Sequence, residues 1–328
     1  MPVTITAGVT FSGGGLTMAF APSPVATAGW FGGGTLAGGT PMVSTVDRII
    51  FATDTATASV RGPLSIINHR VMATGSTTNG YFGGGYVPGT LASLSTVNRI
   101  TYSTDTATAS VRGPLSISIN QGGATTDVTT YGWFGAGTNT TAPTTSISRV
   151  TYATDSDTAV TRGAVTLASW YNLAATGNPS YGYFGGGFTT AVKSSVNRTD
   201  YANDTATASV RGPLAAGRYG LSAVTDSSAY GWYVGGYGSG AFITNIDRIT
   251  YANDTGTASV RGPLNSSKYL VAAACDNTYG WISGGITTGF AFTSNITRMT
   301  YSNDTATTVD RGYLSIARDT HAGSSGIQ

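Results

Sequence analysis

The chain repeats one pattern about every fifty residues, six times along its 328 residues. Each copy has an aromatic run followed by glycines, then a segment such as Ile246–Tyr251, a turn with an aspartate, and a closing Arg-Gly. The closing arginines lie 49 to 51 residues apart, at Arg61, Arg112, Arg162, Arg211, Arg261 and Arg311. A period of this length without a long apolar run indicates a repeat architecture, whose units are stable only when they stack on their neighbours.

Two further charged series keep the same period. The turn aspartates are Asp54, Asp105, Asp155, Asp204, Asp254 and Asp304, and a second set of arginines is Arg48, Arg99, Arg149, Arg198, Arg248 and Arg298. We interpret the three series as structural, with each aspartate capping its turn and each arginine spanning strands or repeats by several hydrogen bonds. Exposed ion pairs contribute only ~0.2–1 kcal/mol each, so we expect them to set orientation and register. The alternative, a sixfold basic ring that binds an anion, is less favoured because an active site normally occurs once.

Composition favours an all-β chain. Charged residues make up 10% of the sequence, there is no glutamate, and lysine occurs only at Lys193 and Lys268, whereas exposed helix faces rely on Glu, Lys, Gln and Leu. The 46 glycines and many Thr, Ser, Val and Tyr residues favour strands and tight turns. A hydrophobic content of 40% argues against disorder.

Each repeat is predicted to contain four antiparallel strands. In the fifth repeat they are a weakly apolar strand in 219–225, an aromatic strand through Trp232 that ends in glycines, the strand Ile246–Tyr251, and a strand that ends in Arg-Gly-Pro-Leu. Proline has no N–H to donate to a ladder, so the fourth strand is predicted to be the outer edge of its sheet. The edge prolines are Pro63, Pro114, Pro213 and Pro263, and Ala164 and Tyr313 replace them in the third and sixth repeats.

These residues resemble the kelch repeat family. The lead basic position of a kelch unit is occupied by Arg218, Lys268 and Arg318, the double glycine by pairs such as 235–236 and 284–285, and the later tyrosine by Tyr251 and Tyr301. Kelch units place a tryptophan soon after that tyrosine, where this sequence has Thr-Ala-Thr-Ala-Ser. The resemblance covers residues 29–328 and implies the blades of a propeller. The recurring Asn-Asp-Thr-Ala-Thr-Ala-Ser-Val-Arg-Gly-Pro-Leu is also similar to repeat proteins of environmental bacteriophages.

The C-terminal tail indicates how many blades there are. Arg318 follows Arg311 by seven residues, the same spacing as from Arg211 to Arg218, so residues 316–328 are predicted to form a first strand without a second. That strand is expected to complete the first repeat and close the ring. The predicted fold is therefore an all-β, six-bladed β-propeller of four-stranded antiparallel blades. Residues 1–28 are predicted to form an N-terminal arm and residues 29–328 the propeller, with repeats that end near 65, 116, 166, 215, 265 and 315.

Several classes of site are disfavoured. His69 and His321 are the only histidines and, with Cys275, have none of the spacings of a metal site, so neither a metal nor a cofactor is predicted. The formal charge of +2 is small and evenly spread, which argues against nucleic acid. No apolar run is long enough for a membrane helix. The first residues lack a Sec signal, so we expect folding in a cytoplasm.

The loops between the second and third strands vary most from repeat to repeat, at about 35–45, 86–96, 138–146, 188–195, 237–244 and 286–295. Binding residues cluster on loops held by a rigid scaffold, and aromatic rings suit glycan faces or protein hot spots. The candidate binding residues are Tyr86, Phe188, Tyr237, Phe290 and Phe292. The alternative is that these rings only cover the sheet above the double glycine.

The leading functional hypothesis is a non-enzymatic structural and interaction protein of a bacteriophage virion, in a tail, a fibre or a capsid decoration. Its expected partners are other virion proteins or a receptor or glycan on the host surface, and its expected location is the particle, after synthesis in the host cytoplasm. One alternative is a glycan- or receptor-binding bacterial adhesin on the extracellular surface. Another is a propeller glycosidase or lyase, because loop aspartates in any propeller can supply paired carboxylates.

Overall fold

The computed structural model describes residues 9–12, 15–18, 26–37, 41–87, 89, 92–166 and 172–327. Much of the predicted N-terminal arm, residues 1–28, lies outside this part. Within it, β1 (Val9–Ser12) and β2 (Gly15–Met18) pair as an antiparallel hairpin. The arm's last residue, Ala28, already belongs to β3, which is the earliest strand along the chain in the six repeats.

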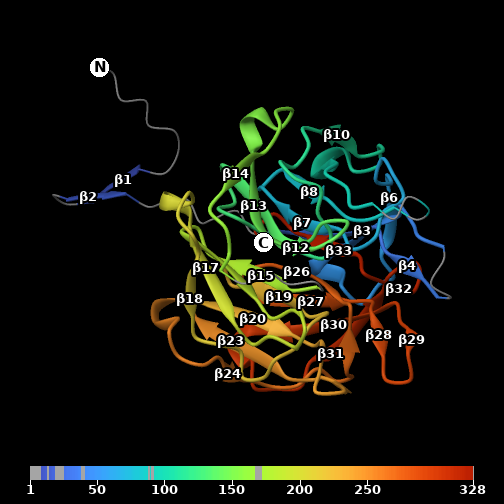
Figure 1. Cartoon of the computed structure of the whole chain (residues 1–328). Helices are drawn as coiled ribbons and strands as arrows, with labels where there is room; N and C mark the ends of the chain where they lie inside the picture. The colour runs from blue at the N-terminus through green and yellow to red at the C-terminus, as the bar shows by residue number, and fades with distance from the viewer. Residues whose placement is uncertain are drawn as a thin grey trace.

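The fold is all-β, and the described residues contain six four-stranded antiparallel sheets (Figure 1). The first strand of each sheet, called here the inner strand, is one of β7 (Met72–Gly75), β11 (Gly123–Thr126), β15 (Ala174–Gly177), β19 (Ser222–Thr225), β26 (Ala272–Cys275) and β33 (Ala322–Ser324). The second strands are β3 (Ala28–Gly32), β8 (Asn79–Gly83), β12 (Tyr131–Thr138), β16 (Tyr181–Gly185), β20 (Tyr230–Val234) and β27 (Tyr279–Ser283).

The third strands are β5 (Val46–Ile50), β9 (Val97–Thr101), β13 (Pro143–Thr151), β17 (Val196–Asp200), β23 (Ile246–Thr250) and β30 (Asn295–Thr300). One short 3-10 turn follows each of them: η1 (Phe51–Thr53), η2 (Tyr102–Thr104), η3 (Tyr152–Thr154), η4 (Tyr201–Asn203), η5 (Tyr251–Asn253) and η6 (Tyr301–Asn303). The fourth strands are β6 (Ser59–Arg61), β10 (Ser110–Arg112), β14 (Val160–Arg162), β18 (Ser209–Arg211), β24 (Ser259–Val260) and β31 (Val309–Tyr313). They form the sheet edges, as the prolines that follow four of them predict.

The inner strands lie against one another. β7 contacts β33 and β11, β15 contacts β11 and β19, and β26 contacts β19 and β33. Figure 1 shows these strands near the middle of the molecule, around the C-terminus, with the edge strands at its periphery. The fifty-residue period of the sequence therefore corresponds to one sheet per repeat, with the sheets side by side.

The C-terminal tail completes the sheet of the first repeat. β33 pairs with β3, with Trp30 opposite Ser324, so strands almost 300 residues apart in sequence share one ladder. The spacing of Arg311 and Arg318 predicts this pairing. A second short pairing follows between β32 (Arg318–Asp319) and β4 (Thr35–Leu36).

The apolar core lies between neighbouring sheets. Trp30 packs in a cluster with Phe82 of the second repeat, whereas the adjacent Phe31 packs with Trp281 of the sixth. Successive residues of a strand point to opposite faces, so both faces of this sheet are covered by other sheets. A sheet with two apolar faces needs a neighbour on each side, so one repeat is not expected to fold alone.

Candidate functional site

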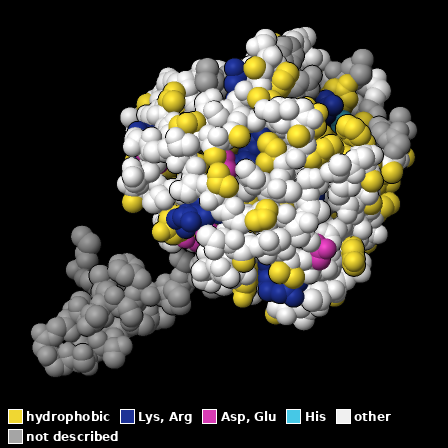
Figure 2. Space-filling view, turned by 90° about the horizontal axis from the view of Figure 1, so that it is seen from below, with side chains coloured by type: hydrophobic (Ala, Val, Ile, Leu, Met, Phe, Trp, Pro, Cys, Tyr) yellow, Lys and Arg dark blue, Asp and Glu magenta, His cyan; other side chains and the backbone are white. Residues whose placement is uncertain are grey.

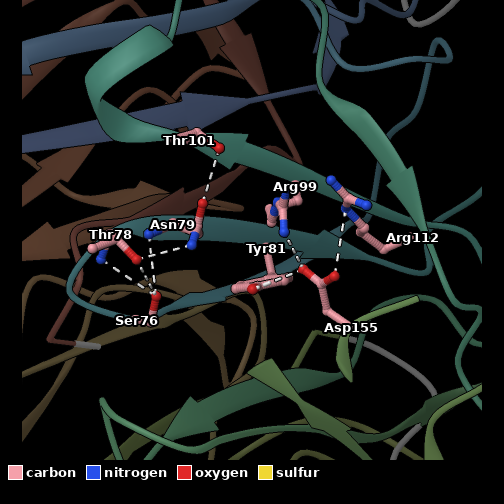
Figure 3. A network of polar contacts seen from close by, with 8 residues as sticks. All are labelled: Ser76, Thr78, Asn79, Tyr81, Arg99, Thr101, Arg112 and Asp155. Atoms are coloured by element: carbon pink, nitrogen blue, oxygen red, sulfur yellow. Dashed lines mark hydrogen bonds and ion pairs between the residues drawn. The ribbon is translucent and has the colours of Figure 1, made fainter. Parts of the chain in front are cut away.

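The turn aspartates form the main polar contacts between sheets. Asp155 accepts a hydrogen bond from Arg99 Nη1 at 2.8 Å and from the Tyr81 hydroxyl at 3.0 Å, and Arg112 Nε lies 3.6 Å from its carboxylate (Figure 3). All three partners belong to the second repeat and Asp155 to the third. The carboxylate, predicted to cap its own turn, therefore joins neighbouring sheets. We call this arrangement the staple.

The same staple recurs in every repeat. An arginine of the third strand lies 2.8–3.0 Å from the carboxylate and the arginine of the Arg-Gly lies 3.4–3.6 Å from it. Asp54 of the first repeat is bound by Trp281, Arg298 and Arg311 of the sixth. The carboxylates are buried, and each periodic arginine already faces a protein carboxylate. This leaves the arginines poorly suited to binding an anion, the alternative considered from the sequence.

Five charged residues outside the periodic series also make contacts inside the protein. Arg218 lies 2.6 Å from Asp247 and Arg318 lies 3.1 Å from Asp47, and all four side chains are buried. At the corresponding position Lys268 donates to Asn295 Oδ1 at 2.5 Å and to Thr297 Oγ1 at 2.7 Å. Burial lowers the pKa of Lys268 to about 8. The lead basic residues therefore attach the segment before an inner strand to the third strand of the same sheet.

The histidines and the cysteine are interior residues. His69 Nδ1 lies 3.0 Å from Thr35 Oγ1, and burial together with the charge of Arg70 lowers the pKa of His69 to about 4. His321 Nε2 lies 2.9 Å from Ser283 Oγ. Burial raises the pKa of the Cys275 thiol to about 12. Within the described part of the chain no three His, Cys, Asp or Glu side chains are grouped so that they could hold a metal ion.

Two sets of loops meet on one face, which we call the loop face. It consists of the segments that precede the inner strands and the segments that follow the double glycines. The two sets pair with each other, at His69 with Tyr86, at Tyr219 with Tyr237, and between β25 (Lys268–Tyr269) and β28 (Ile286–Thr287). The loop face is where the repeats differ in sequence, whereas all six staples have an aspartate and two arginines and differ only in whether the aromatic donor is Tyr or Trp.

Six aromatic rings form one continuous group on the loop face. Tyr219 lies 5.4 Å from both Phe188 and Tyr269, measured between ring centroids. Phe242, on β22 (Ala241–Phe242), lies 5.4 Å from Tyr237 of β21 (Tyr237–Gly238) and 5.5 Å from Phe290. We call this group the aromatic patch; its members are Phe188, Tyr219, Tyr237, Phe242, Tyr269 and Phe290. All are at least partly exposed, and Phe290 is 70% exposed.

A cavity of about 90 Å³ lies between the inner strands beside this patch. Its lining includes the residue that stands two positions before each inner strand: Arg70, Gln121, Asn172, Gly220, Leu270 and Thr320. We call these six residues the cavity mouth. All have positive φ, and backbone hydrogen bonds run between them, such as Leu270 N–H to Gly220 O at 2.7 Å and Arg70 N–H to Thr320 O at 2.8 Å. The Tyr269 ring covers Gly220, where an added Cβ would lie 2.2 Å from it.

The structure unites three of the five predicted binding residues. Phe188, Tyr237 and Phe290 belong to the aromatic patch. Tyr86 lies instead beside His69, with the Arg70 guanidinium 5.6 Å from its ring. Phe292 lies on β29 (Ala291–Phe292), opposite Ile286.

The sequence reasoning missed Tyr219, Phe242 and Tyr269. A signal was present for two of them, because an aromatic residue directly follows the lead basic residue in Arg218-Tyr219 and Lys268-Tyr269. Phe242 lies in one of the variable loops, and no sequence pattern distinguishes its ring from the other residues of that loop.

The surface charge is dispersed on the face shown in Figure 2, where Lys and Arg side chains form small separate groups among polar ones. No described helix is long and apolar enough to cross a membrane. No protein-family model matches the chain, and no curated protein matches it significantly.

Proposed function

We propose that the six sheets form one six-bladed β-propeller of kelch-like repeats, closed by β33. The staples support this arrangement, because each sheet is bound to the next and the sixth repeat is bound to Asp54 of the first. The ladder between β3 and β33 supports it independently. An experimental structure tests the proposal: six blades around one axis are expected, and a linear stack of sheets would contradict it.

We further propose a non-enzymatic structural and interaction module of a bacteriophage particle, at a tail or fibre or on the capsid surface. The observation that carries the proposal is that the charged and the aromatic side chains lie in different places and make different contacts. The periodic charged residues join neighbouring sheets and the lead basic residues hold the segment before an inner strand to its own sheet, whereas the aromatic patch lies on the variable loop face. Binding residues are typically presented in this way, on loops supported by a rigid scaffold. The partners would be other particle proteins or a receptor or glycan of the host surface.

The composition of purified particles tests the virion setting. The chain is expected as a stoichiometric component that persists through density-gradient purification. Its absence from particles, together with its presence on bacterial surfaces, would favour the second candidate, an extracellular bacterial adhesin that uses the aromatic patch. Steady turnover of a polysaccharide by the pure protein would contradict the non-enzymatic assignment.

A further inference from the structure

The aromatic patch interrupts the sixfold pattern on one side of the cavity mouth. Two repeats carry Tyr219 and Tyr269 eight residues after the closing arginine, where three others carry His69, Asn120 and Asp319. The third repeat has Trp170 there, which lies outside the described residues. The six rings of the patch come from neighbouring repeats and contact one another edge to face or at a tilt. At the cavity mouth itself, the patch therefore lies beside Gly220 and Leu270, whereas the other four mouth positions carry polar side chains.

The polar side of the mouth offers several hydrogen-bonding groups. Arg70, Gln121, Asn172 and Thr320 stand there, whereas the positions next to the patch are Gly220 and Leu270. Amide side chains both donate and accept, and a guanidinium donates in a fixed fork. In the part of the chain that the structure describes, no ion pair involves Arg70.

We propose that the loop face binds a neutral oligosaccharide across the cavity mouth. In this arrangement a sugar ring stacks on the aromatic patch, and its hydroxyl groups bond to Arg70, Gln121 and Asn172. This inference rests on the proposed role as an interaction module and names the ligand of that role.

The chemistry of the two sides selects this ligand class. A pyranose ring has an apolar C–H face, which suits the electron-rich face of an aromatic ring, and a rim of hydroxyl groups that need donors and acceptors together. A small-molecule site of this kind combines aromatic lining with a few placed polar groups. An anionic glycan is disfavoured because the mouth has a single cation, Arg70, and the buried Asp319 adjoins Thr320 of the mouth. A protein partner is the competing outcome of the test.

The experiment compares variants on an array of immobilised neutral and anionic oligosaccharides. Wild-type protein is expected to be retained on at least one neutral oligosaccharide. Phe290→Ala and Tyr237→Ala are each expected to raise the dissociation constant for that oligosaccharide at least tenfold. Phe290 is mostly exposed, so its substitution is expected to leave the thermal unfolding midpoint unchanged and separates binding from folding.

Tyr313→Ala is the matched control, because Tyr313 is an aromatic residue 52% exposed on edge strand β31 and outside the patch. It is expected to bind like the wild type. Retention on no neutral oligosaccharide, retention on anionic glycans alone, or equal weakening by Tyr313→Ala would overturn the inference. The inference would also be overturned if the aromatic patch bound a protein of the particle and no oligosaccharide. The virion setting is judged separately by particle composition, so either proposal can fail while the other stands.

Discussion

At the scale of single residues, the turn aspartate contacts three side chains of the neighbouring sheet. In the third repeat Asp155 binds two arginines and a tyrosine of the neighbouring sheet. The aspartate recurs in all six repeats, each time seven residues before the arginine of the closing Arg-Gly. The chain contains no glutamate. The period alone predicts that these residues are structural. Their partners could not be predicted, because every repeat contains both the aspartate and the arginines, and the sequence does not say which copies pair.

The staple predicts a large effect from a small substitution. Asp155→Asn removes the charge that holds Arg99 and Arg112 and replaces an acceptor oxygen by a donor. Removing one partner of a buried ion pair is expected to cost ~3 kcal/mol. Urea unfolding measures the change in the free energy of unfolding. Asp157→Asn, at an exposed position of the same turn, is the control and is expected to be neutral within about 0.5 kcal/mol. Equal losses in the two variants would contradict a structural role of the staple.

Lys268 predicts a pH dependence of stability. Its pKa falls from 10.5 to about 8 in the folded protein because its ammonium is buried. Between these values the unfolded chain binds more protons than the folded one, so the contribution of Lys268 to stability rises with pH. The full difference corresponds to about 3 kcal/mol, with the cost fully present below pH 8. The measurement is the free energy of unfolding at pH 7 and pH 9, compared between wild type and Lys268→Met.

This comparison removes the contributions that the two proteins share, including that of the Cys275 thiol. Burial raises the pKa of that thiol to about 12, so it lowers stability as the pH rises. The wild type is expected to gain about 1 kcal/mol or more relative to Lys268→Met between the two pH values. Parallel pH profiles would show that Lys268 keeps its ordinary pKa.

At the scale of elements, the glycine of each Arg-Gly decides how closely two sheets approach. An added Cβ at Gly212 would lie 1.8 Å from the carbonyl oxygen of Gly256 in the next repeat, and the Gly212 N–H donates to Asp254 O at 2.8 Å. The same close approach occurs at the other five repeats. The strands and their edges were predictable, because alternation, glycine and proline act locally. This contact was not, because nothing local to Gly212 identifies the backbone that faces it.

The pair Gly212 and Gly256 gives a matched experiment. Gly212→Ala forces the two backbones apart and is expected to destabilise the protein by about 3 kcal/mol or to prevent folding. Gly256→Ala adds its methyl group where no atom lies within 4 Å, at a position where other repeats carry Ala56, Ala206 or Ala306. It is expected to be neutral or to stabilise by roughly 0.4–1 kcal/mol. The thermal unfolding midpoints rank the two variants, and the reverse order would contradict the close approach.

At the scale of the whole molecule, the sequence predicts the scaffold better than the candidate site. The contacts of the scaffold recur in six repeats, so the sequence pattern that predicts them occurs six times. The aromatic patch occurs once, and it depends on which loops meet on the loop face. Tyr237 and Tyr219 lie 18 residues apart and form adjacent ring contacts only because their loops pair. A single sequence shows that both are aromatic without showing that they meet.

The pairing of the two chain ends predicts that the repeats unfold as one unit. A chain that ends at Ser315 lacks β32 and β33, which exposes β3 and leaves Asp47 buried without Arg318. An unpaired buried charge costs about 3–5 kcal/mol, and the lost strand adds to this. The truncated chain is therefore expected to unfold at a much lower temperature, with its first and sixth repeats becoming sensitive to protease before the others. A chain that lacks only Gln328 is the control and should melt like the full chain. If the truncated chain kept the full midpoint, the joining of first and last repeats would contribute little to the stability of the molecule.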